Sequence, residues 1–579
     1  MIDPVILEHF RTMKERDELD AILPEILTGM GLEVLSRPSV GVRQYGADIS
    51  AVGKDDDGKR KLFLFSVKRG DLSRIEWNGE SDQALRPSLD EIRDAYLRSV
   101  APEHKRLPVV IITVVGGIVP EKVLPLVNGY MDEKEKENPR FAYRLWTGDS
   151  LTKRVLEGAL REEIFPPERR ALLRKTAALV EEPDMALRQF ARLIDGVLAD
   201  EALSPVERVR TMLIATWIVF SWSRDADNLE AAYDASEQLV LRAWPLLYPV
   251  IKTDRTRKLA ASHVYLAVFE QHLDIWNAYI AEKLLPHTAT LHALSFAIGS
   301  VEPVDINLAM FDLVGKIAAG GLVHLWLSLD GPRYPGTATG FAPTAHAIAQ
   351  ALAEMPNSNP TLKAPMLDRQ SSDLGLALLL LCCFADTQEA ARYWNRQAAQ
   401  ALMIAVTMPK NGPRLPSIDP NYEALLGDDK TLSEEQRKDA TAASTLLPVY
   451  GLCARILGDE GLLRELAEFQ ARHLAHCNAQ TWVPNAGCDD KLWQGNPRTG
   501  SAFQDLEIGA DGGKLLEALR LECAENSAWG GLSAIFLGHW PLMAMACRRN
   551  HLPVPPQLWL DLAQTPGKSS IATNPERSD

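Results

Sequence analysis

The chain has little cysteine, no long apolar run and no excess of basic charge, and each shortage excludes a class of protein. Its 579 residues include 7 cysteines, a sparse and odd number that argues against a disulfide scaffold and for free thiols in a reducing compartment. The longest apolar runs, 212–222 and 374–385, are shorter than the roughly 18–20 residues that cross a bilayer. No secretory signal pattern opens the sequence. We therefore expect a cytoplasmic protein without membrane contact.

The charge balance is acidic, with 62 Lys and Arg against 77 Asp and Glu, a net charge of −15. This argues against a protein that coats nucleic acid over its whole surface. Segment 54–74 is the local exception, because it holds seven basic and four acidic residues. From residue 166 onward the balance is 37 basic against 48 acidic, a net charge of −11. That part would repel DNA and suits protein contact, autoinhibition or assembly into a homo-oligomer.

Two halves with different periodicities indicate two kinds of domain. Residues 1–165 alternate between helical and strand patterns, as in an α/β domain. A helix is predicted over 15–30, and a capping box at Ser88-Leu89-Asp90-Glu91 predicts the start of another. Asp55-Asp56-Asp57-Gly58 predicts a hairpin turn. The predicted strands are 32–37, 46–52, 61–68, 107–115 and 141–146, and the β-branched run 107–115 is typical of a strand that is buried on both faces.

Beyond the Pro-Pro pair at 166–167, amphipathic helical stretches follow one another. Capping boxes that begin at Ser204 and Ser433 predict two helix starts. We expect an all-α, solenoid-like helical array over 168–563, without a fixed repeat period, and a disordered tail over 564–579. No phosphate loop is present, because Leu562 stands where the glycine pattern before Gly567 and Lys568 needs its first glycine. We therefore expect no ATP site in this chain.

The stretch that carries chemistry is Gly46-Ala47-Asp48-Ile49, followed by Phe65-Ser66-Val67-Lys68-Arg69. Strand side chains alternate, so Ser66 and Lys68 share one face of their strand. A lysine at the end of a buried strand, on the side of an aspartate from the neighbouring strand, needs a partner or a use. Phosphodiester hydrolysis supplies one, because a carboxylate can hold Mg²⁺ and a lysine can orient water and offset charge on phosphorus.

Here the chain resembles the PD-(D/E)XK, or restriction-endonuclease-like, nuclease superfamily, and most closely its Mrr-like branch. The resemblance rests on a first helix that ends in Gly-Met-Gly-Leu-Glu-Val at 29–34, the Gly-x-Asp strand at 46–48, the x-x-Lys strand at 66–68 and a last strand and turn at 145–151. It covers residues 1–165 only. It implies a Mg²⁺- or Mn²⁺-dependent DNA endonuclease, in a bacterial antiphage defence or restriction system, with the helical region sensing, restraining or assembling it.

Carried over residue by residue, the resemblance makes Asp48 the metal-binding aspartate and Lys68 the catalytic lysine. The Val67 carbonyl becomes a further metal ligand. Glu18 or Asp20 becomes the acid that some family members place on the first helix, and the sequence does not decide between them.

One position departs from the family. Ser66 stands where the family has Asp or Glu, or Gln in the Mrr-like branch, and a hydroxyl is a weaker Mg²⁺ ligand than a carboxylate. The helix acid, a water held by Ser66, or Asp71 three residues beyond Lys68 would compensate. The alternative is a catalytically impaired, nuclease-like scaffold that binds nucleic acid or a partner protein.

Other polar residues have competing interpretations. Trp77 and Arg86 lie in the loop after the strand and could contact nucleic acid, and the alternative for Trp77 is packing under that loop. His473, His476, Cys477 and Cys488 match no standard zinc module, and core packing explains them more simply. The basic residues near the strand either bind DNA phosphates or form a solvated surface, and they are Lys59, Arg60, Lys61, Arg69 and Arg74.

Overall fold

The computed structural model describes residues 10, 19–36, 45–79, 84–157, 166–253, 258–329, 338–495 and 498–563. The chain divides into two compact units, Met1–Ile275 and Trp276–Asp579. The first unit holds a mixed α/β domain and the helices that follow it, and the second is mainly helical. The predicted boundary near residue 165 falls within 158–165, which lie outside the described residues.

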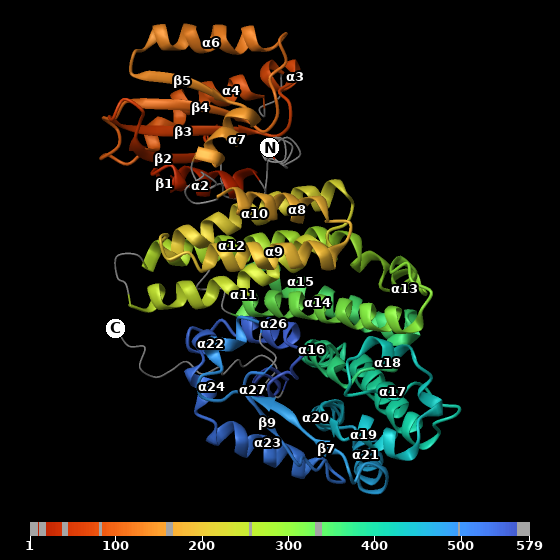
Figure 1. Cartoon of the computed structure of the whole chain (residues 1–579). Coiled ribbons are helices and arrows are strands. Elements are labelled where there is room, and N and C mark those ends of the chain that lie inside the picture. The colour runs from red at the N-terminus through yellow and green to blue at the C-terminus, as the bar shows by residue number, and fades with distance from the viewer. Residues whose placement is uncertain are drawn as a thin grey trace. The chain divides into compact units, whose positions relative to one another are not determined.

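A five-stranded sheet in the order β1-β2-β3-β4-β5 forms the centre of the α/β domain (Figure 1). Strands β1, β2 and β3 pair antiparallel, whereas β3, β4 and β5 pair parallel. The five predicted strands are therefore confirmed to within about three residues at each end. Their bounds are β1 Glu33–Ser36, β2 Ile49–Lys54, β3 Arg60–Lys68, β4 Val109–Val115 and β5 Phe141–Trp146.

Helices supply the connections that parallel pairing requires. One face of the sheet packs against α4 and α6 through a buried apolar cluster that includes Leu64, Leu89, Ile111 and Val127. All seven residues of β4 are buried, as its β-branched run predicts. The helices of this domain are α2 Asp20–Gly29, α3 Arg74–Asn78, α4 Leu85–Glu91, the π-helical turn η2 Ile92–Tyr96, α5 Leu97–Ser99, α6 Leu124–Glu137 and α7 Gly148–Glu157.

Local signals in the sequence succeed at the hairpin and fail at one helix start. Asp55 to Gly58 form the β2–β3 turn, in which Gly58 N–H donates to the Asp55 carbonyl at 2.8 Å and Gly58 takes φ +73°. The predicted helix start at Ser88 is wrong, because α4 already begins at Leu85. Pro87 is tolerated in that first turn, where backbone N–H groups have no helical acceptor. Ser88 is therefore inside the helix, and its hydroxyl donates to the Ala84 carbonyl.

The rest of the first unit is helical: α8 Pro167–Ala178, α9 Pro183–Leu198, α10 Pro205–Asp225, α11 Glu230–Thr253 and α12 Lys258–Trp276, whose last residue opens the second unit. The capping box at Ser204 is confirmed at the start of α10. Within this unit the guanidinium of Arg210 on α10 pairs with Glu25 on α2 at 3.0 Å, and the Glu25 side chain is 1% exposed. A buried ion pair thus connects the α/β domain to the helices behind it.

The second unit is built from helices of unequal length, from four residues in α22 to 27 in α14, and two short two-stranded sheets interrupt them. No regular solenoid is present among its described helices. The capping box at Ser433 is confirmed. Its helices are α13 Ala293–Ala297, α14 Pro303–Leu329, α15 Ala338–Ser358, α16 Ser371–Cys382, α17 Gln388–Thr407, α18 Tyr422–Leu426, α19 Glu434–Ala440, α20 Leu446–Leu457, α21 Glu460–His473, α22 Asp489–Leu492, α23 Gly513–Glu525, α24 Ala528–Gly531, α25 Ser533–Phe536, α26 Pro541–Arg549 and α27 Pro556–Ala563. Its strands are β6 Ala443–Ser444, β7 Asn478–Ala479, β8 Thr481–Val483 and β9 Ser501–Phe503.

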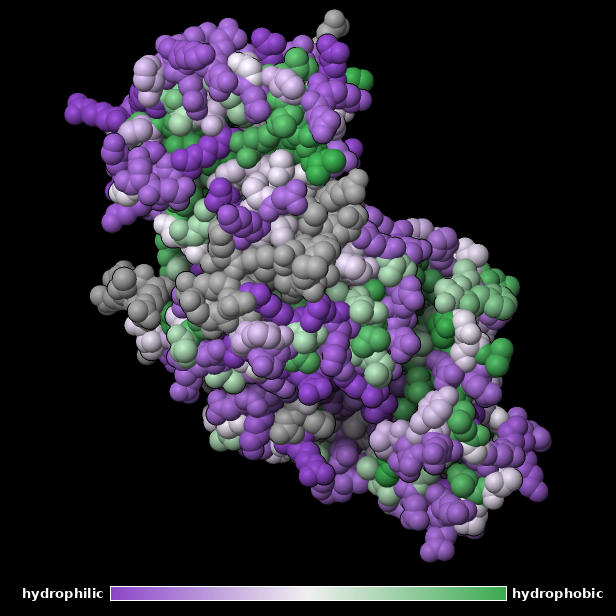
Figure 2. Space-filling view, turned by 45° about the horizontal axis from the view of Figure 1, so that its top comes forward, coloured by the Kyte–Doolittle hydropathy of each residue, from purple (hydrophilic) through white to green (hydrophobic). Residues whose placement is uncertain are grey.

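Helix α14 is, within the described residues, the one helix long and apolar enough to cross a membrane. Of its most apolar stretch, 72% is buried inside the structure, as in the core helix of a globular unit. The face of the molecule in Figure 2 is mostly hydrophilic, with scattered apolar patches. All seven cysteines lie in the described residues and are free thiols, as expected.

Candidate functional site

The candidate site lies where β2 begins and β3 ends. Ile49, the first residue of β2, pairs with Phe65 in antiparallel register, and Asp48, directly before it, donates its N–H to the Phe65 carbonyl at 2.8 Å. Residues opposite each other share a face of the sheet, and so do residues two apart on one strand. Ser66 and Lys68 therefore share one face of β3, and Asp48 lies beside them where β2 begins. Asp48 and Lys68 are half-buried, and Ser66 is 2% exposed.

The Asp48 carboxylate is held by the backbone of the next strand. The Val67 N–H donates to Asp48 Oδ2 at 2.7 Å. On β3 the odd-numbered residues direct their backbone groups to β2, whereas Lys68 directs its carbonyl to Gly116 of the loop after β4. The Val67 carbonyl thus points to the same side of β3 as the Asp48 carboxylate. The Asp48 carboxylate and the Val67 carbonyl oxygen therefore lie near each other, where β2 begins beside the end of β3.

Glycine is required in the turn before Asp48. Gly46 has φ +79°, a conformation that L side chains rarely adopt, and an added Cβ would overlap the carbonyl oxygen of Ser88 on α4. The Gly-x-Asp pattern therefore combines a backbone requirement with a carboxylate. The turn lies directly against the helix that covers this face of the sheet.

Asp71 holds two loops together at the end of the sheet. Its Oδ1 accepts the Ile118 N–H at 2.9 Å, and Leu72 N–H donates to the Ile118 carbonyl. A Cβ on Gly117 would overlap the same carboxylate oxygen. The described residues contain no group of three or more His, Cys, Asp or Glu side chains that could hold a metal ion. Glu18 lies outside the described residues, and Asp20 is the first residue of α2 with its side chain outside them.

The structure adds one polar side chain, Thr113, that the sequence pattern did not single out as a candidate. Thr113 is 0% exposed in the centre of β4 and pairs in register with Ser66. Its Oγ1 has no hydrogen-bond partner among the described residues. The signal in the sequence was a single polar residue within the run Val-Val-Ile-Ile-Thr-Val-Val.

The five basic residues predicted to bind DNA lie at opposite ends of β3. Lys59, Arg60 and Lys61 begin the strand, and Arg69 and Arg74 follow its end, next to Lys68. Eight strand steps between Arg60 and Lys68 amount to about 27 Å. Lys59, Arg69 and Arg74 are exposed, while Arg60 lies 3.6 Å from Glu33.

Lys61 is engaged in an ion-pair cluster with the β2–β3 turn. Its Nζ lies 2.5 Å from Asp55 and 3.0 Å from Asp57. Arg144 on β5 makes two further hydrogen bonds to Asp55, at 2.9 and 2.6 Å. The hydrogen bond from Arg144, assisted by that from Lys61, holds the pKa of the Asp55 carboxyl far below its usual range. Lys61 therefore neutralises an intramolecular acid, and its contact with DNA stays a prediction.

Trp77 and Arg86, the two candidates for nucleic-acid contact in the segment after β3, both contact the ring of Tyr130. Trp77 is 2% exposed and makes an edge-to-face contact with Tyr130 at 5.6 Å between ring centroids. Arg86 lies over the same tyrosine ring at 5.5 Å and bonds Asn78. The packing interpretation of Trp77 is thus supported.

The cysteine and histidine residues near 473–488 form no metal cluster within the described chain. His476 Nε2 lies 2.9 Å from Thr441 Oγ1, and His473 packs on Phe469. Burial raises the pKa of the Cys477 thiol to about 12, which disfavours the thiolate that zinc requires.

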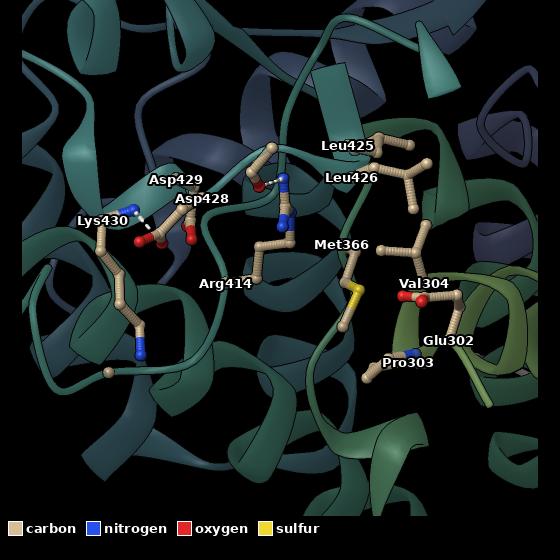
Figure 3. A pocket seen from close by; sticks show the side chains of 12 residues that line it. Glu302, Pro303, Val304, Met366, Arg414, Leu425, Leu426, Asp428, Asp429 and Lys430 are labelled. Carbon is tan, nitrogen blue, oxygen red and sulfur yellow. Dashed lines mark hydrogen bonds between the residues drawn. The ribbon is translucent and has the colours of Figure 1, made fainter. Parts of the chain in front are cut away.

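A surface hollow of about 390 Å³ lies in the second unit. In Figure 3 the side chains of Asp428, Asp429 and Lys430 lie on one side of Arg414, and the apolar side chains lie on the other side together with Glu302. Its charged lining combines three acids with two cations, so the hollow does not select the charge of a ligand. The five are Glu302, Asp428, Asp429, Arg414 and Lys430.

Comparison of the chain with protein-family models, with curated proteins and with solved structures finds no match in any of the three.

Proposed function

We propose that residues 1–165 are a PD-(D/E)XK-type, Mrr-like nuclease domain and that the protein is a Mg²⁺- or Mn²⁺-dependent DNA endonuclease. The observation that carries the proposal is the hydrogen bond from the Val67 N–H to the Asp48 carboxylate, which places that carboxylate beside the end of β3 where Lys68 lies. The order of elements supports it: one helix, three antiparallel strands, a helical crossover and a parallel fourth strand. This is the order that the resemblance implies for the family's core.

The residues present fit a hard divalent cation, because the donors are a carboxylate, a carbonyl and hydroxyl oxygens. Asp48 and the Val67 carbonyl would hold the ion. The chemistry that Mg²⁺ or Mn²⁺ would supply is polarisation of the scissile phosphate and a lower pKa of a water molecule. Lys68 orients the attacking water and offsets the charge that develops on phosphorus. Arg69 and Arg74 follow Lys68 and are exposed, so they can contact the DNA backbone.

The experiment uses the purified full chain with Mg²⁺ or Mn²⁺ on plasmid DNA, oligonucleotide duplexes, single strands and RNA. Asp48→Ala and Lys68→Ala should abolish cleavage. Asp56→Ala and Lys54→Ala are matched controls, because both residues are exposed near the far end of the same hairpin. Cleavage by Asp48→Ala at the wild-type rate would refute the proposed site. Preferred cleavage of RNA would keep the site and change the substrate.

For the helical region we propose sensing, autoinhibition or assembly, as a homo-oligomer or with a partner protein, in cytoplasmic antiphage defence or restriction. The net charge of −11 after residue 165 supports protein contact over DNA contact. The buried Glu25–Arg210 pair supports a mechanical link, since it ties the first helix of the nuclease domain to α10.

A second candidate function is a nuclease-like scaffold that binds nucleic acid or a partner without cutting. Ser66 favours it, because the site then has one carboxylate where the family has two, and Ser66 is almost fully buried. In this case the wild type binds DNA at low salt but leaves it intact with either metal, and Ser66→Glu gains cleavage.

A further inference from the structure

Thr113 is a buried hydroxyl in a strand that has no structural need for one. The other six residues of β4 are valine or isoleucine, and all seven are buried. Valine has nearly the same shape as threonine and carries no polar group. A buried hydroxyl without a hydrogen bond lowers stability, so most such groups in proteins have a partner, and exceptions mark catalytic groups or a bound water or ion. Thr113 Oγ1 has no partner among the described residues.

The sheet register places this hydroxyl in line with the candidate site. Thr113 pairs with Ser66 on one side of β3, and on the other side of β3 the Asp48 carboxylate accepts the N–H of Val67, the residue after Ser66. Neighbouring strands are about 4.8 Å apart, so Thr113 lies about 5 Å from Ser66 and about 10 Å from Asp48 at the backbone. That separation excludes direct coordination by Thr113 of an ion held at Asp48, so an interaction between them requires an intervening water.

We propose that Thr113 is a positioning residue: together with Ser66 it hydrogen-bonds the water that hydrates a divalent cation held by Asp48 and the Val67 carbonyl. This inference rests on the proposed function and deepens it. Mg²⁺ keeps several waters when few carboxylates bind it, and a hydroxyl can both donate to and accept from such a water. The two hydroxyls thus take over the orienting role of the acid that the resembled family has at position 66.

The test compares Thr113→Val and Thr113→Ser with the wild type, all as full-length protein. Groups that orient metal-bound ligands typically contribute about 10- to 100-fold in metal affinity. We expect Thr113→Val to weaken Mn²⁺ binding, measured by electron paramagnetic resonance, about tenfold and to raise the Mg²⁺ concentration for half-maximal cleavage equally. Thr113→Ser should stay within about threefold of the wild type, because it keeps the hydroxyl.

The metal-free protein supplies a readout that does not depend on activity. Thr113→Val should unfold at the same or a higher temperature than the wild type, since it removes a buried hydroxyl that makes no bond. Thr216→Val is the matched control: Thr216 is 0% exposed in α10, and its hydroxyl donates to the Met212 carbonyl at 2.9 Å. This control should lower thermal stability and leave Mn²⁺ binding unchanged.

The outcomes separate the inference from the proposed function. Wild-type Mn²⁺ affinity in Thr113→Val, in a protein where Asp48→Ala loses that affinity, would overturn the inference alone. A wild type that neither binds Mn²⁺ nor cleaves would overturn the proposed function and the inference with it. Equal losses of Mn²⁺ affinity in Thr113→Val and Thr113→Ser would also overturn the inference, because they would show that the packing of Thr113 matters and its hydrogen bonding does not.

Discussion

The ion-pair cluster at Asp55 offers a direct test of how the sheet is held together. Its carboxylate is 4% exposed and joins the β2–β3 turn to β5 through Arg144 and to β3 through Lys61. Arg144→Met keeps the aliphatic stem and removes two charge-assisted hydrogen bonds to Asp55. Two such bonds, at about 1.5–3 kcal/mol each, would total about 3–6 kcal/mol, and solvent screening at the one-third exposed Arg144 reduces the sum to about 2–3 kcal/mol.

Hydrogen exchange measured by mass spectrometry is the appropriate assay, because a chain of several units does not unfold in one step. A loss of 2–3 kcal/mol corresponds to about 30- to 150-fold faster exchange, since about 1.4 kcal/mol is a factor of ten. The acceleration should be confined to the β2–β3 hairpin and β5, while α20 in the second unit stays unchanged. Because the pKa of Asp55 is depressed in the folded state, its stabilisation is present above about pH 4 and is lost as the pH falls further. Less than threefold acceleration at pH 7, or equal acceleration in α20, would refute this reasoning.

Three further outcomes are expected. Gly46→Ala should strongly reduce folded protein and solubility, because it adds a Cβ at φ +79° against the Ser88 carbonyl; full wild-type solubility would contradict this. Arg210→Ala should destabilise α2 by about 3 kcal/mol, seen as faster exchange in α2, because Glu25 is left buried without this cation; Glu25→Gln combined with Arg210→Ala should recover part of the loss. Burial lowers the pKa of His324 to about 4, so the stability that the neutral ring contributes is present above about pH 6.5 and is lost as the pH falls toward 4. His324→Phe should therefore flatten the pH dependence of the thermal midpoint between about pH 4 and 6.5, and an unchanged slope would contradict the assignment.

The candidate site was only partly accessible to sequence reasoning. Period-two alternation places Ser66 and Lys68 on one face, and the structure adds the pairing of β2 with β3 that brings Asp48 to the end of β3. The hydrogen bond from Val67 to the Asp48 side chain depends on how the strands meet, which no pattern within one strand determines. Thr113 is 47 residues from Ser66 in the sequence, and only the parallel pairing of β3 with β4 brings the two together.

Local signals predicted elements well where the determining contacts are close in sequence. The turn at Asp55 to Gly58 and the capping boxes at Ser204 and Ser433 close hydrogen bonds within three residues, so neighbouring residue types determine them. The same pattern at Ser88 failed, because packing of Leu85 and Leu89 extends the helix by a turn before the predicted start. A capping pattern therefore indicates where a helix can begin, and the burial of neighbouring apolar residues determines whether the helix begins there.

By itself, the sequence determined the positions of the five strands along the chain, the complete burial of β4 and the change from mixed to helical structure, because these follow from residue periodicity. Only the tertiary structure decided which charges meet. Arg144 reaches Asp55 across 89 residues, and Arg210 reaches Glu25 across 185. Such pairings depend on strand order and helix packing, which are set by the burial of apolar surface over whole elements and leave no trace in the spacing of any one motif.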